Sequence, residues 1–287
     1  MTAESQSSTE KIGPTAWMVA YRRTFTDIPL CNEIFNELES LRINSGEPEV
    51  AAELQRPETA PQFEARYKLV DRLLGKTSIR QVLELASGFS PRGMNMVQGD
   101  ITYVEVDLHG VMGNKRAIAE KLQPATSNTL HLENGNVLEL KDLEHTIQHF
   151  DPNKSLAIIN EGLMRYLNLE EKAILAKNVH TLLSKFGGVW ITPDISLKKT
   201  QENEDKITSG HIKKISEMTG VDIAGNRFDN ADQAKTFFEN LGFSIESHSF
   251  LEVTGELSSV KRQDTSQEML MRLNGDAVVF VMRVKNN

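Results

Sequence analysis

The sequence predicts an α/β protein with a doubly wound, mainly parallel sheet of seven strands, an N-terminal layer of helices and a helical insertion late in the chain. From residue 79 onward, short apolar runs alternate with longer segments of helical periodicity, the pattern of a parallel sheet covered by helices on both faces. In addition, small residues follow the first apolar run and Asp107 ends the second. Strand–helix–strand units that bind a nucleoside have this arrangement.

Helices are expected before the sheet. Apolar residues recur at helical spacing over residues 17–38 and 63–74, so residues 13–75 are predicted to form the N-terminal helices. Residues 1–12 are polar and acidic and are expected to be a disordered tail. Because no linker-like segment follows, residues 13–287 are predicted to form a single domain.

The expected strands are short apolar runs separated by segments of helical periodicity. The strands are predicted at residues 80–85, 101–106, 128–132, 155–160, 188–193, 243–249 and 277–284, and the helices at residues 112–122, 139–147, 169–186 and 231–241. The polar segment between the last two strands fits no clear amphipathic helix, so these strands are expected to form an antiparallel hairpin. Residues 195–230 lack strand character and are predicted to be a helical cap inserted over the strand ends.

Composition limits the partners. The formal net charge is −8, which disfavours a nucleic-acid partner, although a local basic groove could still lie on an acidic protein. The N-terminus has no signal-peptide pattern and no run reaches the roughly 20 apolar residues that cross a bilayer, so we expect a cytoplasmic protein without a membrane partner.

Cys31, the only cysteine, excludes an internal disulfide and is expected to be buried. His145 and His149 have the spacing of helical zinc ligands, but no third ligand accompanies them and no metal is expected. The oligomeric state is not predicted.

The loop after the first strand, residues 86–91, is expected to contact a nucleoside. Gly88 lets the backbone approach a ligand closely, and Asp107 can accept hydrogen bonds from both hydroxyls of a ribose. Glu84 is expected to contact the same loop, because a charged residue inside a buried strand is costly unless it is paired. A nicotinamide cofactor also uses an acid-ended strand, but it requires a G-x-G-x-x-G loop, and here Pro91 replaces the third glycine.

Five segments, in this order along the chain, resemble the leucine carboxyl methyltransferase family, in particular its bacterial branch related to the tetracenomycin-type polyketide O-methyltransferases. They are residues 15–23 (TAWMVAYRR), 63–67 (FEARY), 81–92 (QVLELASGFSPR), 104–108 (VEVDL) and 159–167 (INEGLMRYL). The resemblance implies a class I methyltransferase with a Rossmann-like sheet. It also implies S-adenosyl-L-methionine as the cofactor.

The resemblance further implies roles around that cofactor. Arg66 would hold the carboxylate of its methionine part, and Glu161 would hold the amino group, which Glu84 could also contact. Asn136 would bind the adenine through a hydrogen bond, and Val137 would line it with an apolar face.

The chain departs from the family pattern at three positions. Ala86 stands where glycine is usual, His109 where proline is common, and Asn136 where aspartate is common. We expect Ala86 to be tolerated with a negative φ, and Asn136 to accept a bond from the adenine amino group through its side-chain oxygen. For Arg92, two interpretations stay open: a role like that of Arg66, or a cap of the following helix.

The expected function is transfer of a methyl group from S-adenosylmethionine to an oxygen of a small molecule or of a carboxylate. Tyr21, Arg22 and His211 are the acceptor-side candidates, and each also fits a packing or solvent-exposed role. The lack of a convincing general base favours an acidic acceptor or simple proximity catalysis, since a carboxylate needs no base whereas an alcohol or phenol benefits from one. The alternatives are a catalytically silent cofactor-binding or interaction protein and an NAD(P)-dependent oxidoreductase.

Overall fold

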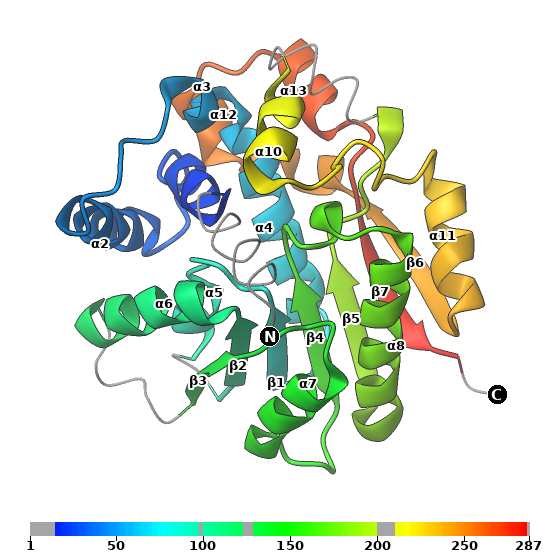
Figure 1. Cartoon of the computed structure of the whole chain (residues 1–287). Coiled ribbons are helices and arrows are strands. Elements are labelled where there is room, and N and C mark those ends of the chain that lie inside the picture. Colours follow the sequence, from blue (N-terminus) through cyan, green and yellow to red (C-terminus); the bar gives the residue numbers. More distant parts are fainter. Residues whose placement is uncertain (1–14, 98–99, 123–128, 200–209, 286–287) are drawn as a thin grey trace.

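The computed structural model describes residues 15–97, 100–122, 129–199 and 210–285 (Figure 1). Its centre is one sheet of seven strands in the order β3-β2-β1-β4-β5-β7-β6. The strands are β1 Gln81–Leu85, β2 Thr102–Asp107, β3 Leu130–Asn134, β4 Leu156–Asn160, β5 Gly188–Thr192, β6 Phe243–Ser249 and β7 Val278–Val284. Strands β1 to β5 pair in parallel, and β7 runs antiparallel to both β5 and β6. The predicted fold class and the antiparallel pairing of the last two strands are confirmed.

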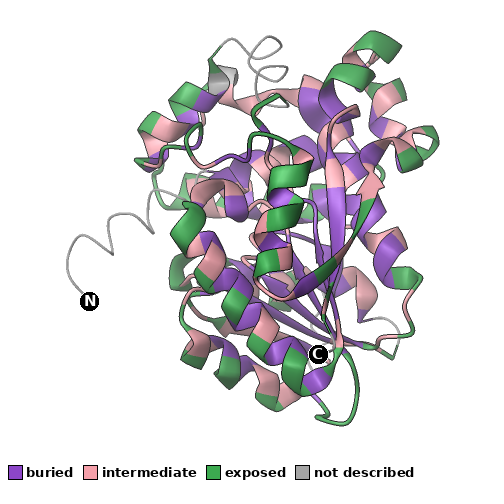
Figure 2. Cartoon of the chain, turned by 90° about the vertical axis from the view of Figure 1, so that its right-hand side faces the viewer, coloured by how far each residue is buried: buried purple, intermediate pink, exposed green. Residues whose placement is uncertain are grey.

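The central strands are buried on both faces, because helices cover both sides of the sheet. Every residue of β1 and β4 is buried, which explains their continuous apolar runs. Along β1, Val82 belongs to one core cluster whereas Leu83 and Leu85 belong to the other, as the alternation of side chains along a strand requires. Figure 2 shows the buried strands between helices whose outer faces are exposed.

Helices account for most of the remaining described chain. Residues 15–23 are helical, and the further helices are α2 Cys31–Asn44, α3 Ala52–Gln55, α4 Ala60–Gly75, α5 Arg92–Met96, α6 His109–Leu122, α7 Leu140–Thr146, α8 Leu169–Phe186, α10 His211–Thr219 and α11 Ala231–Asn240. Helix α8 has the predicted bounds, and Asn168 and Glu171 form a capping box at its start. Cys31 is buried, as predicted.

The prediction for the segment between β6 and β7 was wrong. This segment contains a 3-10 helix, Phe250–Glu256, and the helices α12 Ser258–Arg262 and α13 Gln267–Asn274, all of which contact α4. These helices are only five to eight residues long, so each is too short for the apolar spacing of a helix to repeat clearly along the sequence. Packing on α4 stabilises them instead.

The late insertion is helical in part. Within it, α10 buries Ile212 and Ile215, and an isolated bridge joins Leu197 to Phe228. Residues 200–209 of the predicted cap and residues 1–12 of the predicted tail lie outside the described residues. In the described part of the chain, no helix is long and apolar enough to cross a membrane. The single-domain organisation and the cytoplasmic location stay predictions.

The sheet register places the candidate site. Leu85 of β1 is level with Val106 of β2 and with Asn160 of β4, and Asp107 is level with Asn134 of β3. The residues that follow these strand ends therefore meet at one edge of the sheet, where open α/β sheets bind their ligands.

Candidate cofactor site

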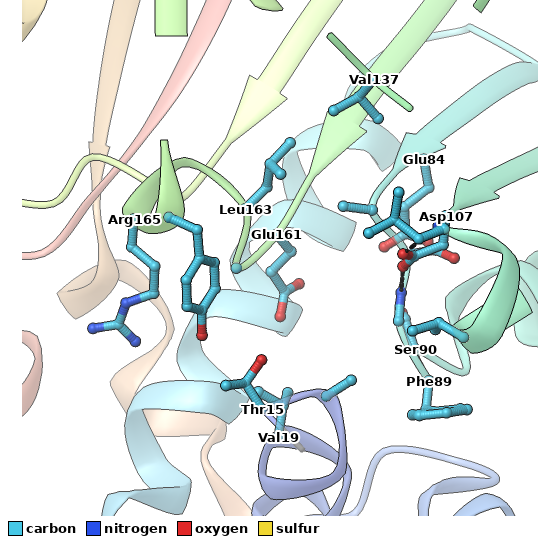
Figure 3. Close-up of a pocket in the computed structure, with 18 of the residues that line it drawn as sticks. Thr15, Val19, Glu84, Phe89, Ser90, Asp107, Val137, Glu161, Leu163 and Arg165 are labelled. Carbon is cyan, nitrogen blue, oxygen red and sulfur yellow. Dashed lines mark hydrogen bonds between the residues drawn. The ribbon is translucent and has the colours of Figure 1, made fainter. Parts of the chain in front are cut away.

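A cavity of about 360 Å³ lies at the carboxyl ends of β1, β2 and β4. All eight residues predicted to bind the cofactor line it: Arg66, Glu84, Ala86, Gly88, Asp107, Asn136, Val137 and Glu161. Six residues of the helix at 15–23 also line it, as does Phe63 of α4 beside Arg66, so the N-terminal helical layer forms part of the wall. Figure 3 shows Glu84, Asp107, Val137 and Glu161 around this cavity.

Asp107 fixes the loop after β1. Its Oδ2 accepts a hydrogen bond from the Gly88 amide at 2.6 Å and its Oδ1 one from the Leu108 amide at 2.7 Å. Burial raises the pKa of Asp107, although these two backbone bonds and the nearby Lys115 act against the rise. A carboxylate can accept about four hydrogen bonds, which leaves capacity for two ribose hydroxyls.

The prediction of a negative φ at Ala86 was wrong. Its φ is 52°, in the left-handed region rather than at the expected negative value. The turn out of β1 requires this conformation, since the Ser87 amide donates to the Val106 carbonyl at 3.3 Å. Alanine is strained there by roughly 1–2 kcal/mol relative to glycine. Gly88 has a φ of 53°, so its backbone too needs the freedom of glycine.

The adenine segment follows β3. The Asn136 amide donates to Asp142 Oδ2 at 2.9 Å, and the Asn136 side-chain oxygen accepts from the Leu138 amide at 3.1 Å. Because this oxygen already accepts the hydrogen bond from Leu138, a bond to an adenine amino group would use its second lone pair. Val137 is buried, and its carbonyl accepts from Asn178 at 3.1 Å.

Glu161 joins three arginines. Its Oε1 pairs with Arg23 and, at 2.8 Å, with Arg66 Nε, while its Oε2 accepts from Arg92 at 2.8 Å. The Glu161 side chain is only 2% exposed. Burial alone would raise its pKa, but Arg66, Arg23 and Arg92 outweigh that effect and hold the pKa far below its usual range.

Arg92 is the hub of this network. It is fully buried and reaches Asp71 at 2.6 Å, Glu84 at 2.6 Å and Glu161 at 2.8 Å through its three guanidinium nitrogens. Of the two interpretations of Arg92, neither describes its side chain, which binds carboxylates of the protein itself. Burial raises the pKa of Asp71 to about 6, against the opposing effect of Arg92.

Glu84 is held from two sides. One oxygen pairs with Arg92 at 2.6 Å, and the other accepts from the Tyr103 hydroxyl at 2.8 Å. Glu84 lines the cavity but serves this network, rather than bonding the backbone of the loop that follows β1.

The three acceptor-side candidates differ. Tyr21 does not line the cavity and stacks on Trp17, with ring centroids 5.5 Å apart, so the packing interpretation holds for it. Arg22 lines the cavity and donates to the carbonyls of Leu54 and Gln55, each at 3.1 Å. His211 begins α10, but its side chain lies outside the described part of the structure.

Sequence reasoning missed four residues of the site. Arg23 touches Glu161, Asp71 and Tyr103 complete the network around Arg92, and Asp194 holds the loop after β4. Arg23 stands in a segment that carries the family resemblance, which was a usable signal. For Asp194 the signal was its place just after β5, at the same edge of the sheet.

His145 and His149 do not act together. His149 bonds Glu133 at 2.8 Å and stacks on His131. Among the residues that the structure describes, no three histidine, cysteine or acidic side chains are grouped as metal ligands.

The model of the leucine carboxyl methyltransferase family matches residues 28–180, slightly more than half of the chain. A protein of Mycobacterium tuberculosis (strain H37Ra), whose name assigns it to the S-adenosyl-L-methionine-dependent methyltransferases, is 28% identical over 218 residues. The match covers 67% of this chain and 68% of that protein.

Solved structures share the fold. A DUF574 family protein of Streptomyces avermitilis superposes with a TM-score of 0.57 at 14% identity, covering 95% of this chain and 97% of that one. The magnesium protoporphyrin IX methyltransferase of Synechocystis PCC 6803, solved with bound SAH, gives a TM-score of 0.51 at 12% identity, covering 88% of this chain and 94% of that one. The family match also decides against the nicotinamide alternative. The chain therefore belongs to the leucine carboxyl methyltransferase family and is a methyltransferase that uses S-adenosyl-L-methionine.

Proposed function

We propose that the protein transfers the methyl group of S-adenosylmethionine to an oxygen of a small molecule, and that this oxygen belongs to a carboxylate. The residues present fit the cofactor. Asp107 retains acceptor capacity, Glu161 and Arg66 stand together, and the buried Nε of Arg23 has no hydrogen-bond partner in the described part of the chain. The bound cofactor would supply an electrophilic methyl group on a sulfonium ion, so the protein's task is to position the acceptor.

The cavity has two sides. We call Asp107, Asn136, Val137 and the loop 86–91 the donor side. Figure 3 places Arg165 across the cavity from Asp107, with Glu161 between them. We give the name acceptor side to seven other residues of the lining: Val19, Arg22, Phe63, Arg165, Tyr166, Ile215 and Val221.

The composition of the acceptor side is the observation that carries the proposal. It combines apolar side chains with two arginines, a surface that suits an acid with an apolar body. No histidine lines the cavity among the residues that the structure describes. A carboxylate acceptor is already ionised at neutral pH and needs no general base.

Catalysis would then depend on orientation. The arginines would hold the acceptor's carboxylate in line with the methyl–sulfur bond, and the apolar wall would exclude water from the acceptor. Orientation of this kind contributes roughly 7–11 kcal/mol of barrier lowering. A small-molecule partner agrees with the acidic net charge of −8, which offers no overall basic surface to a nucleic acid. The absence of nucleic-acid and membrane partners stays a prediction.

The test is an assay of the full chain with S-adenosylmethionine and paired acceptors that differ only in carrying a carboxylate or a hydroxyl on one apolar body. We expect methyl esters, identified by mass spectrometry and by their release as methanol in mild base. Asp107→Ala should abolish turnover through loss of cofactor binding. Products that are stable ethers or methylated amines would contradict the proposal.

A further inference from the structure

The loop after β4 carries Glu161, and its shape is set from the neighbouring strand. Residues Glu161, Gly162 and Leu163 line the cavity. Gly162 has a φ of 84°, so the chain turns there in a conformation that favours glycine. Such a turn leaves several amide groups in need of partners.

Asp194 supplies those partners. It follows β5 and is 7% exposed. Its Oδ1 accepts from the Gly162 amide at 2.7 Å, and its Oδ2 accepts from the Leu163 amide at 2.7 Å and the Met164 amide at 3.2 Å. Three consecutive amides thus converge on one carboxylate, the arrangement in which a backbone turn binds an anion.

A side-chain relay holds the same carboxylate from below. The side-chain amide nitrogen of Asn160 donates to Asp194 Oδ2 at 2.8 Å, and the side-chain oxygen of Asn160 accepts from the Trp190 indole at 2.7 Å. The Asp194 amide itself donates to Thr192 Oγ1 at 3.2 Å. All three supporting residues are fully buried, so they fix the position of Asp194.

We propose that Asp194 is a positioning residue that acts through Glu161, by holding the 161–164 loop so that Glu161 faces the amino group of the methyl donor. This inference rests on the proposed function and on the predicted role of Glu161 in holding that amino group. Asp194 does not line the cavity. Its effect should therefore be confined to the amino-acid end of the cofactor and spare the adenosine end at Asp107.

Two ligands separate these ends. S-adenosylhomocysteine carries the amino-acid group, and 5′-methylthioadenosine lacks it. In calorimetric titration of the full chain, Asp194→Asn should lower the affinity for S-adenosylhomocysteine by about tenfold, the equivalent of one charged hydrogen bond. The affinity of the same variant for 5′-methylthioadenosine should stay within about twofold of the wild-type value. Asp229→Asn is the matched control, because Asp229 is an exposed carboxylate paired with Lys198, and it should change neither affinity.

Two further variants keep the test decisive. Asn160→Ala removes one of the four hydrogen-bond donors to Asp194. It should lower the affinity for S-adenosylhomocysteine alone, by about threefold. In a Glu161→Gln background, Asp194→Asn should have less than a twofold further effect, because residues that act through one another are not additive. A purely structural role would instead give additive losses.

If Asp194→Asn lowered the affinity for both ligands equally, or for neither, the inference would be overturned while the proposed function stayed intact. Wild-type protein that binds neither ligand would overturn the cofactor assignment and this inference with it.

Discussion

The donor side and the acceptor side of the cavity are built differently. On the donor side, a carboxylate holds a backbone amide between adjacent strands, as Asp107 at the end of β2 does for Gly88 in the loop after β1. On the acceptor side, side chains from distant parts of the chain line one cavity, as Arg22, Arg165 and Val221 do. The donor side thus depends on the sheet, whereas the acceptor side depends on how the N-terminal helices and the late insertion pack over it.

The largest expected effect concerns the ion network that joins the two sides. Glu161→Gln would leave the charges of Arg23, Arg66 and Arg92 without their shared partner in a buried site. We expect a loss of about 3–5 kcal/mol in the free energy of unfolding, measured by urea denaturation at pH 7. Glu268→Gln, at a carboxylate with a 75% exposed side chain, should change the value by less than about 1 kcal/mol. Similar losses in the two variants would contradict a buried network.

The pH dependence of Glu161 has a definite sign. Its folded pKa lies below its usual range, so its stabilisation is present above the unfolded pKa of about 4.3 and is lost as the pH falls through the folded value. Wild-type protein should therefore lose stability in acid more steeply than Glu161→Gln.

The next effect separates the two sides by kinetics. Arg165→Gln should raise the KM of an acid acceptor about tenfold, or about 1.4 kcal/mol, because it removes a charged donor from the acceptor side. The KM of S-adenosylmethionine should not change. An equal rise in both values would show that Arg165 supports the cavity as a whole. Arg272→Gln, at an arginine paired with Glu268 outside the cavity, is the control.

A smaller effect concerns the donor side alone. Ala86→Gly should stabilise the protein by about 1 kcal/mol, because glycine adopts a φ of 52° without the strain of a Cβ. Thermal unfolding would show this as a raised midpoint. Ala119→Gly within α6 should have the opposite sign and about the same size. A lower midpoint in Ala86→Gly would mean that the alanine methyl group makes a contact worth more than the strain.

The smallest effect is the titration of Asp71. Its folded pKa, about 6, lies above the unfolded value of about 3.9. Its contribution is full below the unfolded pKa and is lost as the pH rises through 6. Asp71→Asn should therefore flatten the change in stability between pH 4 and 6, as measured by urea denaturation across that range. The side chain is 33% exposed, so solvent screening keeps the effect small. An unchanged slope would exclude Asp71 as its source.

The donor side could be predicted from the sequence because its parts are local. The strand that ends at Asp107 and the loop with Gly88 each show their role in a few adjacent residues. The register of parallel strands then brings them together. The sign of φ at Ala86 could not be predicted, since it depends on the turn that the Ser87 amide makes toward β2.

The acceptor side resisted prediction for the opposite reason. Tyr21 and Arg22 are adjacent in sequence, yet one packs on Trp17 and the other lines the cavity. Only the docking of the helix at 15–23 against α4 decides between these outcomes. The hub role of Arg92 likewise depends on Asp71, Glu84 and Glu161, which come from three separate elements.

The two tryptophans of the chain are optical reporters in two different parts of the molecule. Trp17 lies in the N-terminal helix, where its indole donates to Glu39 at 3.0 Å, and Trp190 lies beneath the 161–164 loop, where its indole donates to Asn160 at 2.7 Å. Trp17→Phe would leave emission from Trp190 alone, and Trp190→Phe would leave emission from Trp17 alone. Fluorescence of these two variants can therefore follow changes in the N-terminal helix and beneath the 161–164 loop separately, without a label.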